Sequence, residues 1–229
     1  MTFRFRTIIV THTGQGGSGG IAFAAFAKQH KQKGGFILLT KEAPDFTADA
    51  VYPNSSIAPF TLSSLRGKYV VLFFYPMDFT FVCPTEILSF DRALEEFARK
   101  NCALVSVSTD SAYAHYAWRQ MEIKKGGVGN IRFPMVADVD KKIARSYGVL
   151  LNDSVALRGL FLIDREGIVQ HATLNNLTIG RNVEEVLRVL EALLFYEKHG
   201  EVCPANWHPG EEGIKQSPRG VAQYLASHC

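Results

Sequence analysis

Four cysteines are the residues of this sequence best suited to redox chemistry, and they stand at positions 83, 102, 203 and 229. A cysteine attacks peroxide and disulfide bonds as its thiolate, not as its protonated thiol. Four thiols so widely spaced do not make the disulfide framework of a small secreted domain, so we expect a reducing compartment. Zinc ligands normally come as two close pairs, and Cys203 and His208 are the nearest pair here. We therefore expect no metal site and no cofactor.

Cys83 is the strongest candidate for a nucleophile because of the residues on either side of it. Proline is favoured at the first position of a helix, so Pro84 predicts a helix that begins next to Cys83. The free backbone N–H groups of that first turn would face the sulfur and favour its anion. Thr80 and an arginine from elsewhere could then hold a peroxide and stabilise the oxygen that leaves. The alternative is an unreactive cysteine in the core, and the local sequence alone does not separate these two interpretations.

Strand-like and helix-like segments alternate from about Glu42 onward and predict an α/β fold. The strand-like segments are short apolar or β-branched runs at 70–75, 103–108, 133–137, 157–163 and 168–174. Apolar residues at helical spacing fall between them, in one stripe over residues 87–97 and a longer one over 183–194. Alternating strands and helices build a sheet with helices packed on it. Gly167 lies between the last two strands and predicts an antiparallel hairpin at one edge.

The first forty residues contain five basic residues and no acidic one. A glycine run at 14–20 matches both the dinucleotide-binding pattern G-x-G-x-x-G and the nucleophile pattern G-x-S-x-G. Two motifs from one glycine run indicate low specificity, and the further parallel strands that a dinucleotide fold needs do not follow. We prefer an organelle transit peptide, which would place the protein in a mitochondrion or another organelle. The alternative is a disordered extension of a cytoplasmic protein.

Composition and charge argue against several classes of partner. The formal net charge is +3, of which the first forty residues carry +5, so the remainder is slightly acidic and has no long basic run. This gives no electrostatic reason to expect nucleic acid or an anionic membrane as partner. No apolar stretch approaches the roughly 18 residues of a membrane-spanning helix. We expect a soluble protein with one globular domain that acts on small or protein substrates.

The segment around Cys83 resembles the active-site signature of the typical 2-Cys peroxiredoxins. The pattern Pro76-x-x-x-Thr80-x-x-Cys83 lies within Phe-Tyr-Pro-Met-Asp-Phe-Thr-Phe-Val-Cys-Pro-Thr-Glu at residues 74–86. The resemblance extends over residues 41–226. It includes Asp110-Ser111, Ala117-Trp118, Gly-Gly-Val-Gly-Asn at 126–130, Ala-Leu-Arg-Gly at 156–159, Gly180-Arg181 and Val-Cys-Pro-Ala-Asn-Trp at 202–207.

This resemblance implies a thioredoxin-like fold, with a central mixed sheet flanked by helices and a C-terminal arm. It implies that Cys83 is the peroxidatic cysteine, which hydrogen peroxide or an organic hydroperoxide oxidises to a sulfenic acid. Thr80 would hydrogen-bond the thiolate and the peroxide, and Pro76 would shield the site from water. Three charged residues complete the implied site: Arg158, which supplies positive charge, and Glu86 and Arg181, which surround it.

Cys203 is the implied resolving cysteine. It lies in a segment with proline and glycine after the longer helical stripe, which is typical of an arm. A sulfenic acid condenses with a second thiol to a disulfide, which a dithiol protein then reduces by exchange. In this family the second thiol belongs to the partner subunit. The resemblance thus implies a homodimer, a ring of dimers and a thioredoxin-like reductant.

The chain is expected to divide into three segments. They are an N-terminal extension (1–40), a thioredoxin-like domain (41–198) and a C-terminal arm (199–229) that carries Cys203. Cys102 stands among apolar neighbours and is expected to be a packing residue, and we assign Cys229 no role.

Two departures from the family concern overoxidation. Sensitive members carry Gly-Gly-Leu-Gly and a Tyr-Phe pair in the final helix, whereas here Val128 replaces the leucine and Leu225 follows Tyr224. We predict that Cys83 is intermediate in its susceptibility to overoxidation to a sulfinic acid.

Two other functions are alternatives to the peroxidase: a chaperone or redox-relay role of the oligomer, and a thioredoxin-like reductase. The reductase would need Cys-x-x-Cys, but Glu86 occupies the second position.

Overall fold

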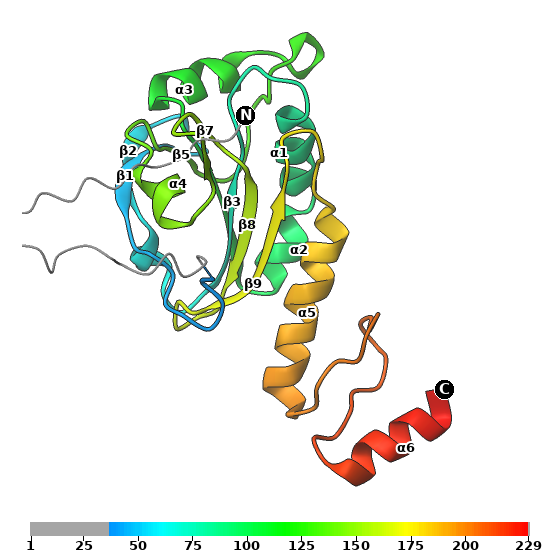
Figure 1. Ribbon diagram of the computed structural model, residues 1–229. Helices are drawn as coiled ribbons and strands as arrows, with labels where there is room; N and C mark the ends of the chain where they lie inside the picture. Colours follow the sequence, from blue (N-terminus) through cyan, green and yellow to red (C-terminus); the bar gives the residue numbers. More distant parts are fainter. Residues whose placement is uncertain (1–36, 229) are drawn as a thin grey trace, which may run out of the picture. The chain divides into compact units, whose positions relative to one another are not determined.

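The structure, a computed structural model, describes residues 37–228, and a seven-stranded sheet forms its centre (Figure 1). The strand order is β2-β1-β5-β4-β3-β8-β9. These strands are β1 (Thr47–Val51), β2 (Ile57–Thr61), β3 (Tyr69–Phe74), β4 (Cys102–Ser108), β5 (Met135–Ala137), β8 (Arg158–Ile163) and β9 (Val169–Asn175). Two short strands, β6 (Leu150–Leu151) and β7 (Val155–Ala156), pair separately. The glycine run at 14–20 lies outside the described residues.

The sheet is mixed, as expected. β3, β4 and β5 run parallel, while β8 pairs antiparallel with β3 and β1 antiparallel with β5. The five predicted strands correspond to β3, β4, β5, β8 and β9, with ends that differ by two residues at most. The hairpin at Gly167 is confirmed: β8 and β9 are antiparallel, β9 is an edge strand, and the glycine has a φ of +85°. Strands β1 and β2 were not predicted.

Helices cover both faces of this sheet. They are α1 (Cys83–Arg92), α2 (Leu94–Arg99), α3 (Ala112–Gln120), α4 (Lys142–Ser146), α5 (Val183–His199) and α6 (Pro218–His228), with 3-10 turns η1 (Leu62–Leu65) and η2 (Ile123–Lys125). Figure 1 shows α1, α2 and α5 on one side of the central strands and α4 on the other. The predicted stripe over 87–97 is therefore two helices, broken at Ala93, and the stripe over 183–194 is α5.

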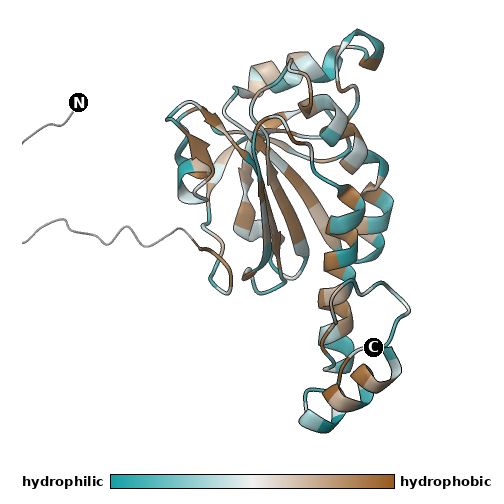
Figure 2. Ribbon diagram, turned by 45° about the vertical axis from the view of Figure 1, so that its right-hand side comes forward, coloured by the Kyte–Doolittle hydropathy of each residue, from teal (hydrophilic) through white to brown (hydrophobic). Residues whose placement is uncertain are grey.

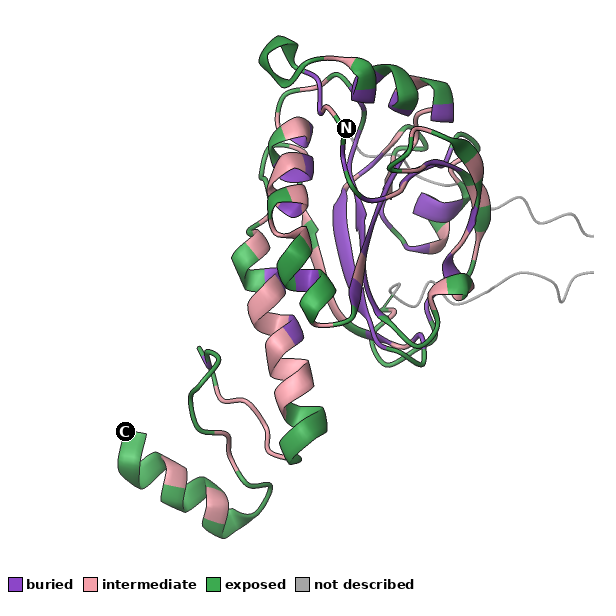
Figure 3. Ribbon diagram, turned by 180° about the vertical axis from the view of Figure 1, so that it is seen from behind, coloured by how far each residue is buried: buried purple, intermediate pink, exposed green. Residues whose placement is uncertain are grey.

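β3 is buried along its whole length and separates two hydrophobic clusters. Successive side chains of a strand point to opposite faces. Val71 and Phe73 thus pack with residues of α1, α2 and α5, whereas Leu72 and Phe74 pack with Ile143 of α4. Figure 2 shows that the central strands are apolar, and Figure 3 shows that they are buried. β3 ends at Phe74, directly before the loop that leads to Cys83.

The chain after α5 forms the C-terminal arm. α5 ends at His199, and Gly200 follows it with the left-handed φ of +69° that commonly terminates a helix. Val202 and Ile214 then form an isolated antiparallel bridge, and α6 has no buried residue. Across residues 37–228, none of the helices is both long enough and apolar enough to cross a membrane.

Candidate active site

Cys83 lies at the start of α1, directly after the loop that follows β3. Val82 is the N-cap, so Cys83 is the first helical residue and Pro84 the second, one position later than predicted. The thiol is fully buried. It lies at the end of the helix where the backbone dipoles place partial positive charge, which favours an anion there. The expected helix start beside Cys83 is confirmed.

Among residues 37–228, two side chains hydrogen-bond with the Cys83 sulfur. Thr80 Oγ1 lies 2.9 Å from Cys83 Sγ and 2.8 Å from the carbonyl oxygen of Met77. A hydroxyl has one proton, so Thr80 can donate to the sulfur or to that carbonyl, and an ionised sulfur is the stronger acceptor. Arg158 Nη1 lies 3.4 Å from Cys83 Sγ. The sulfur thus has a hydroxyl donor and a guanidinium donor as neighbours.

Glu86 joins two arginines behind the sulfur. Its Oε2 accepts from Arg158 Nη1 at 2.7 Å, and its Oε1 accepts from Arg181 Nε at 2.8 Å. Arg158 also donates to the carbonyl of Leu177, and Arg181 to the carbonyls of Phe74 and Gly159. All three charged side chains are at most 4% exposed. Two guanidinium groups and one carboxylate leave one positive charge beside the Cys83 sulfur.

Arg181 is fixed in place although burial opposes its charge. Burial lowers the pKa of its guanidinium, and the hydrogen bonds and charge of Glu86 act in the opposite direction. Its guanidinium also lies over the ring of Phe73, 5.3 Å from the ring centre. Among the predicted residues, the structure therefore brings together Cys83, Thr80, Glu86, Arg158 and Arg181.

A second polar network, which was not predicted, supports the loop that carries Thr80. Asp78 accepts from the Tyr75 hydroxyl at 2.8 Å and contacts His115 Nδ1 at 2.7 Å. Asp110 accepts from the backbone N–H of Asp78 at 2.9 Å and from the Ser108 hydroxyl at 2.7 Å. Burial raises the pKa of Asp78, and the contact with His115 opposes that shift. These contacts tie the loop to the ends of β3 and β4.

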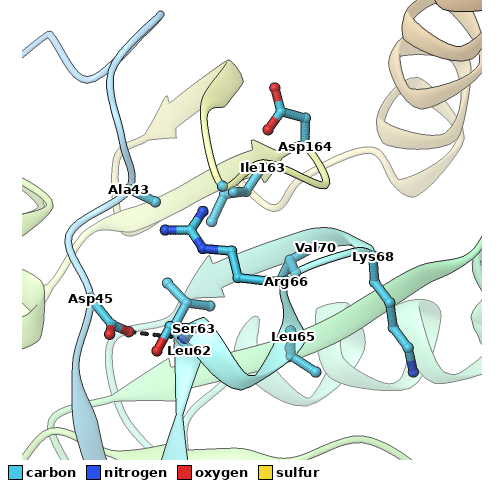
Figure 4. Close-up of a pocket in the computed structure, with 11 residues that line it drawn as sticks. Ala43, Asp45, Leu62, Ser63, Leu65, Arg66, Lys68, Val70, Ile163 and Asp164 are labelled. Atoms are coloured by element: carbon cyan, nitrogen blue, oxygen red, sulfur yellow. Dashed lines mark hydrogen bonds between the residues drawn. The ribbon is translucent and has the colours of Figure 1, made fainter.

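No group of three or more histidine, cysteine, aspartate or glutamate side chains within residues 37–228 is arranged to hold a metal ion. The small cavity in Figure 4 lies elsewhere, between η1 and the β8–β9 turn, and is lined in part by Arg66 and Asp164. Its volume is about 10 Å³, which leaves room for about one water molecule. None of the residues around Cys83 lines it.

Comparison with known proteins decides what this arrangement belongs to. Residues 39–172 match the AhpC/TSA family, and residues 192–227 match the C-terminal domain of 1-Cys peroxiredoxin. The chloroplastic 2-Cys peroxiredoxin BAS1 of Hordeum vulgare is 51% identical over 191 residues, 83% of this chain and 91% of that protein. The thioredoxin peroxidase of Echinococcus granulosus is 50% identical over 188 residues, 82% of this chain and 97% of that protein.

The chain belongs to the AhpC/TSA family of peroxiredoxins. It is a thiol-dependent peroxidase, as the names of these relatives at about 50% identity show. The reduced 2-Cys peroxiredoxin of Plasmodium vivax matches the fold with a TM-score of 0.82 and 49% identity, and covers 83% of this chain and 99% of that one. The mitochondrial 2-Cys peroxiredoxin of Plasmodium falciparum matches with a TM-score of 0.70 and 49% identity, over 73% and 100%. The expected family and the thioredoxin-like fold are confirmed.

Two further cysteines of this peroxiredoxin, Cys102 and Cys203, lie on other elements than Cys83. Cys203 is partly exposed in the arm, where its Sγ donates to the carbonyl of Ala192 on α5 at 3.5 Å. Cys102 begins β4 in the core, and burial raises its pKa to about 12. Both are free thiols, as is Cys83. Cys229 lies outside the described residues.

The remaining expectations for this peroxiredoxin concern residues at the edges of the site. Pro76 is buried on the loop before Thr80, and its role as a shield from water stays a prediction. Val128 is buried in the cluster beneath α1, while Leu225 is 48% exposed on α6. The intermediate susceptibility to overoxidation also stays a prediction.

Proposed function

We propose that the Cys83 thiolate attacks the O–O bond of hydrogen peroxide or of an organic hydroperoxide. An S–O bond forms and the O–O bond breaks. The second oxygen leaves with the bonding pair, takes a proton and departs as water or an alcohol. The sulfur loses two electrons and becomes a sulfenic acid.

The contact of Cys83 Sγ with both Thr80 and Arg158 is the single observation that carries this proposal. The thiolate needs stabilisation before the reaction, and the leaving oxygen gains negative charge during it. Donors fixed in advance around the sulfur serve both needs without reorganisation. Glu86 and Arg181 hold Arg158 in its orientation.

Cys203 is proposed as the resolving thiol, acting on Cys83 of a partner subunit. Cys203 lies beside Ala192 of α5, whereas the Cys83 site contacts the chain at Arg181, just before α5 begins. At a rise of 1.5 Å per residue, roughly 13 Å of helix separate the start of α5 from Ala192. Within one subunit, the arm would have to move over that distance to bring Cys203 to Cys83. The arm of a partner subunit can supply Cys203 without this movement. Relatives named 2-Cys peroxiredoxin support a mechanism with two cysteines.

The proposed reductant is a thioredoxin-like dithiol protein, because several relatives are named thioredoxin peroxidase. Exchange of its two thiols with the disulfide would return both cysteines to the reduced state. The proposed assembly is a homodimer that associates into a ring of dimers. Its support is a group of exposed apolar side chains on the active-site loop and α3: Met77, Phe79, Phe81, Tyr113 and Tyr116. Side chains of this kind are typical of protein interfaces.

The proposed segments are the extension 1–40, the domain 41–198 and the C-terminal arm, as expected from the sequence. An organelle is the proposed location. Relatives named as chloroplastic and mitochondrial support it, together with the basic character of the first forty residues.

Peroxide consumption coupled to a thioredoxin system tests the proposal. We expect Cys83→Ser to abolish turnover and Cys102→Ser, the matched control, to retain it. Turnover by Cys83→Ser at the rate of the unchanged protein would disprove the assignment of Cys83.

A further inference from the structure

The loop that carries Cys203 is held against α5. This Cys203 loop (residues 202–214) is closed by two backbone hydrogen bonds between Val202 and Ile214, at 3.0 and 2.8 Å. Trp207 is only 2% exposed, and its ring packs on Phe195 of α5 with 5.0 Å between the ring centres. The indole N–H donates to the carbonyl of Glu211 at 3.1 Å. Cys203 thus has a defined position on the helix.

One face of α5 makes the contacts with this loop. Arg188, Ala192 and Phe195 are four and three residues apart, and residues with this spacing share a helix face. The Cys203 thiol donates to the carbonyl of Ala192, and Arg188 Nη1 donates to the carbonyl of Trp207 at 2.9 Å. The guanidinium of Arg188 and the thiol of Cys203 therefore both lie along the same face of α5.

We propose that Arg188 is a positioning residue for Cys203, which holds the Cys203 loop on α5 and favours the thiolate of Cys203. The inference rests on the proposed function, in which Cys203 resolves the sulfenic acid. In that step the Cys203 thiolate attacks the Cys83 sulfur. The S–S bond forms, the S–O bond breaks, and hydroxide leaves and takes a proton to become water. The Cys83 sulfur is reduced and the Cys203 sulfur is oxidised.

The charges around Cys203 are consistent with this role. Burial raises the pKa of Cys203, and the positive charge of Arg188 lowers it. Glu185 pairs with Arg188 through both oxygens, at 2.6 Å to Nε and 2.8 Å to Nη2. The charges of His171 on β9 and His208 on the loop lower the pKa of Glu185. The Glu211 carboxylate accepts a hydrogen bond from the backbone N–H of His208. Glu185 offsets part of the Arg188 charge, so the two side chains act on Cys203 in opposite directions.

The test is the rate at which iodoacetamide alkylates Cys203 between pH 6 and pH 11, in a Cys83→Ser/Cys229→Ser background that leaves Cys203 as the accessible thiol. We expect Arg188→Gln to slow alkylation at pH 7 by about three- to tenfold, and the difference from the parent to shrink as the pH rises towards 11. Arg188→Lys should restore most of the rate. Glu185→Gln should speed alkylation at pH 7, because it removes only the opposing charge.

A purely structural anchor gives a different result. Loss of an anchor would change the alkylation rate by the same factor at every pH, and in the same direction for Arg188→Gln and Glu185→Gln. Either that pattern or superimposable pH profiles would overturn the inference.

A single-turnover experiment separates this inference from the function on which it rests. In protein that retains Cys83, the ratio of disulfide formation to sulfenic acid formation should fall for Arg188→Gln by the same factor as alkylation. If Cys203→Ser still forms the disulfide, the proposed resolving role fails, whatever Arg188 does. If Cys203→Ser blocks the disulfide while Arg188→Gln alters neither measurement, only the role of Arg188 fails.

Discussion

Thr80 is the side chain whose contribution to the reactivity of Cys83 can be isolated most cleanly. Its hydroxyl lies 2.9 Å from Cys83 Sγ, and its methyl group can be kept while the hydroxyl is removed. We expect Thr80→Val to lower the rate constant for oxidation of Cys83 by about 10²-fold, the usual effect of losing one fixed donor to a developing anion. Stopped-flow fluorescence under single-turnover conditions measures this rate. Thr80→Ser retains the donor and should stay within about tenfold of the parent; equal losses in both variants would refute the role of the hydroxyl.

Cys102 contrasts with Cys83, because we expect its thiol to remain protonated in the folded protein. Burial raises its pKa to about 12. A folded-state pKa above the unfolded value contributes stability below the unfolded value of about 9, and that contribution is lost as the pH rises towards 12. At pH 10 this loss is on the order of 1 kcal/mol relative to pH 7.

The difference between the parent protein and Cys102→Ala isolates this effect, because both share every other titrating group. Urea unfolding at pH 7 and pH 10 gives the two free energies of unfolding. The parent should lose more stability than Cys102→Ala between these pH values. An equal loss in both proteins would show that the Cys102 thiol is not shielded from water.

At the scale of the elements, the turn between β8 and β9 depends on a glycine. Gly167 has a φ of +85°, where a side chain is strained, and an added Cβ would meet the guanidinium of Arg66. Gly167→Ala should therefore lower the free energy of unfolding by about 1–2 kcal/mol. Urea denaturation measures it, and Glu166→Ala, at an exposed position of the same turn, is the control. An unchanged midpoint for Gly167→Ala would contradict the assigned conformation.

How much of these elements could be predicted depends on where their stability comes from. β3 is a continuous apolar run and β8 is one apart from Arg158 at its start, and both are buried on both faces, so composition identifies them. β1 has the sequence Thr-Ala-Asp-Ala-Val, which has little intrinsic strand preference. It is a strand because it pairs with both β2 and β5, and the pairing with β5 joins residues more than 80 positions apart, such as Ala50 and Val136.

In the active site, too, local sequence predicts only those residues that lie close together in the chain. Cys83, Thr80 and Glu86 lie within seven residues of one another, so local spacing could suggest them. Arg158 and Arg181 were identified only through the family resemblance, because nothing local marks a distant arginine as a partner. The contact of Asp78 with His115 was missed since it joins residues 37 positions apart, and a histidine on a helix gives no signal of its partner. The predicted residues therefore do lie around the Cys83 sulfur, whereas part of the polar network that supports their loop carries no signal in the sequence.

At the scale of the whole molecule, the proposed assembly should depend on the exposed apolar side chains near the active site. Phe81 is 93% exposed, so replacing it should not disturb the fold of a single subunit. We expect Phe81→Glu to lower the mass of the native assembly, because a charge in an apolar interface is costly to desolvate. Light scattering after size-exclusion chromatography gives this mass. Ile37→Glu, at a residue that is 65% exposed elsewhere, should leave it unchanged. The same mass for Phe81→Glu and the parent would exclude this surface from the interface.

The two cysteines belong to different regions of the molecule, one fully buried at the start of α1 and one in the C-terminal arm. A cycle that uses both has two separable steps: oxidation at Cys83 and disulfide formation with Cys203.

The most direct test is one turnover with a single equivalent of hydrogen peroxide in the presence of dimedone, which traps sulfenic acid, followed by mass spectrometry and non-reducing electrophoresis. Cys203→Ser should consume the peroxide, carry the dimedone adduct on Cys83 and form no disulfide-linked dimer. Cys83→Ser should leave the peroxide unreacted and carry no adduct. Peroxide consumption by Cys83→Ser, or a disulfide-linked dimer of Cys203→Ser, would contradict the account.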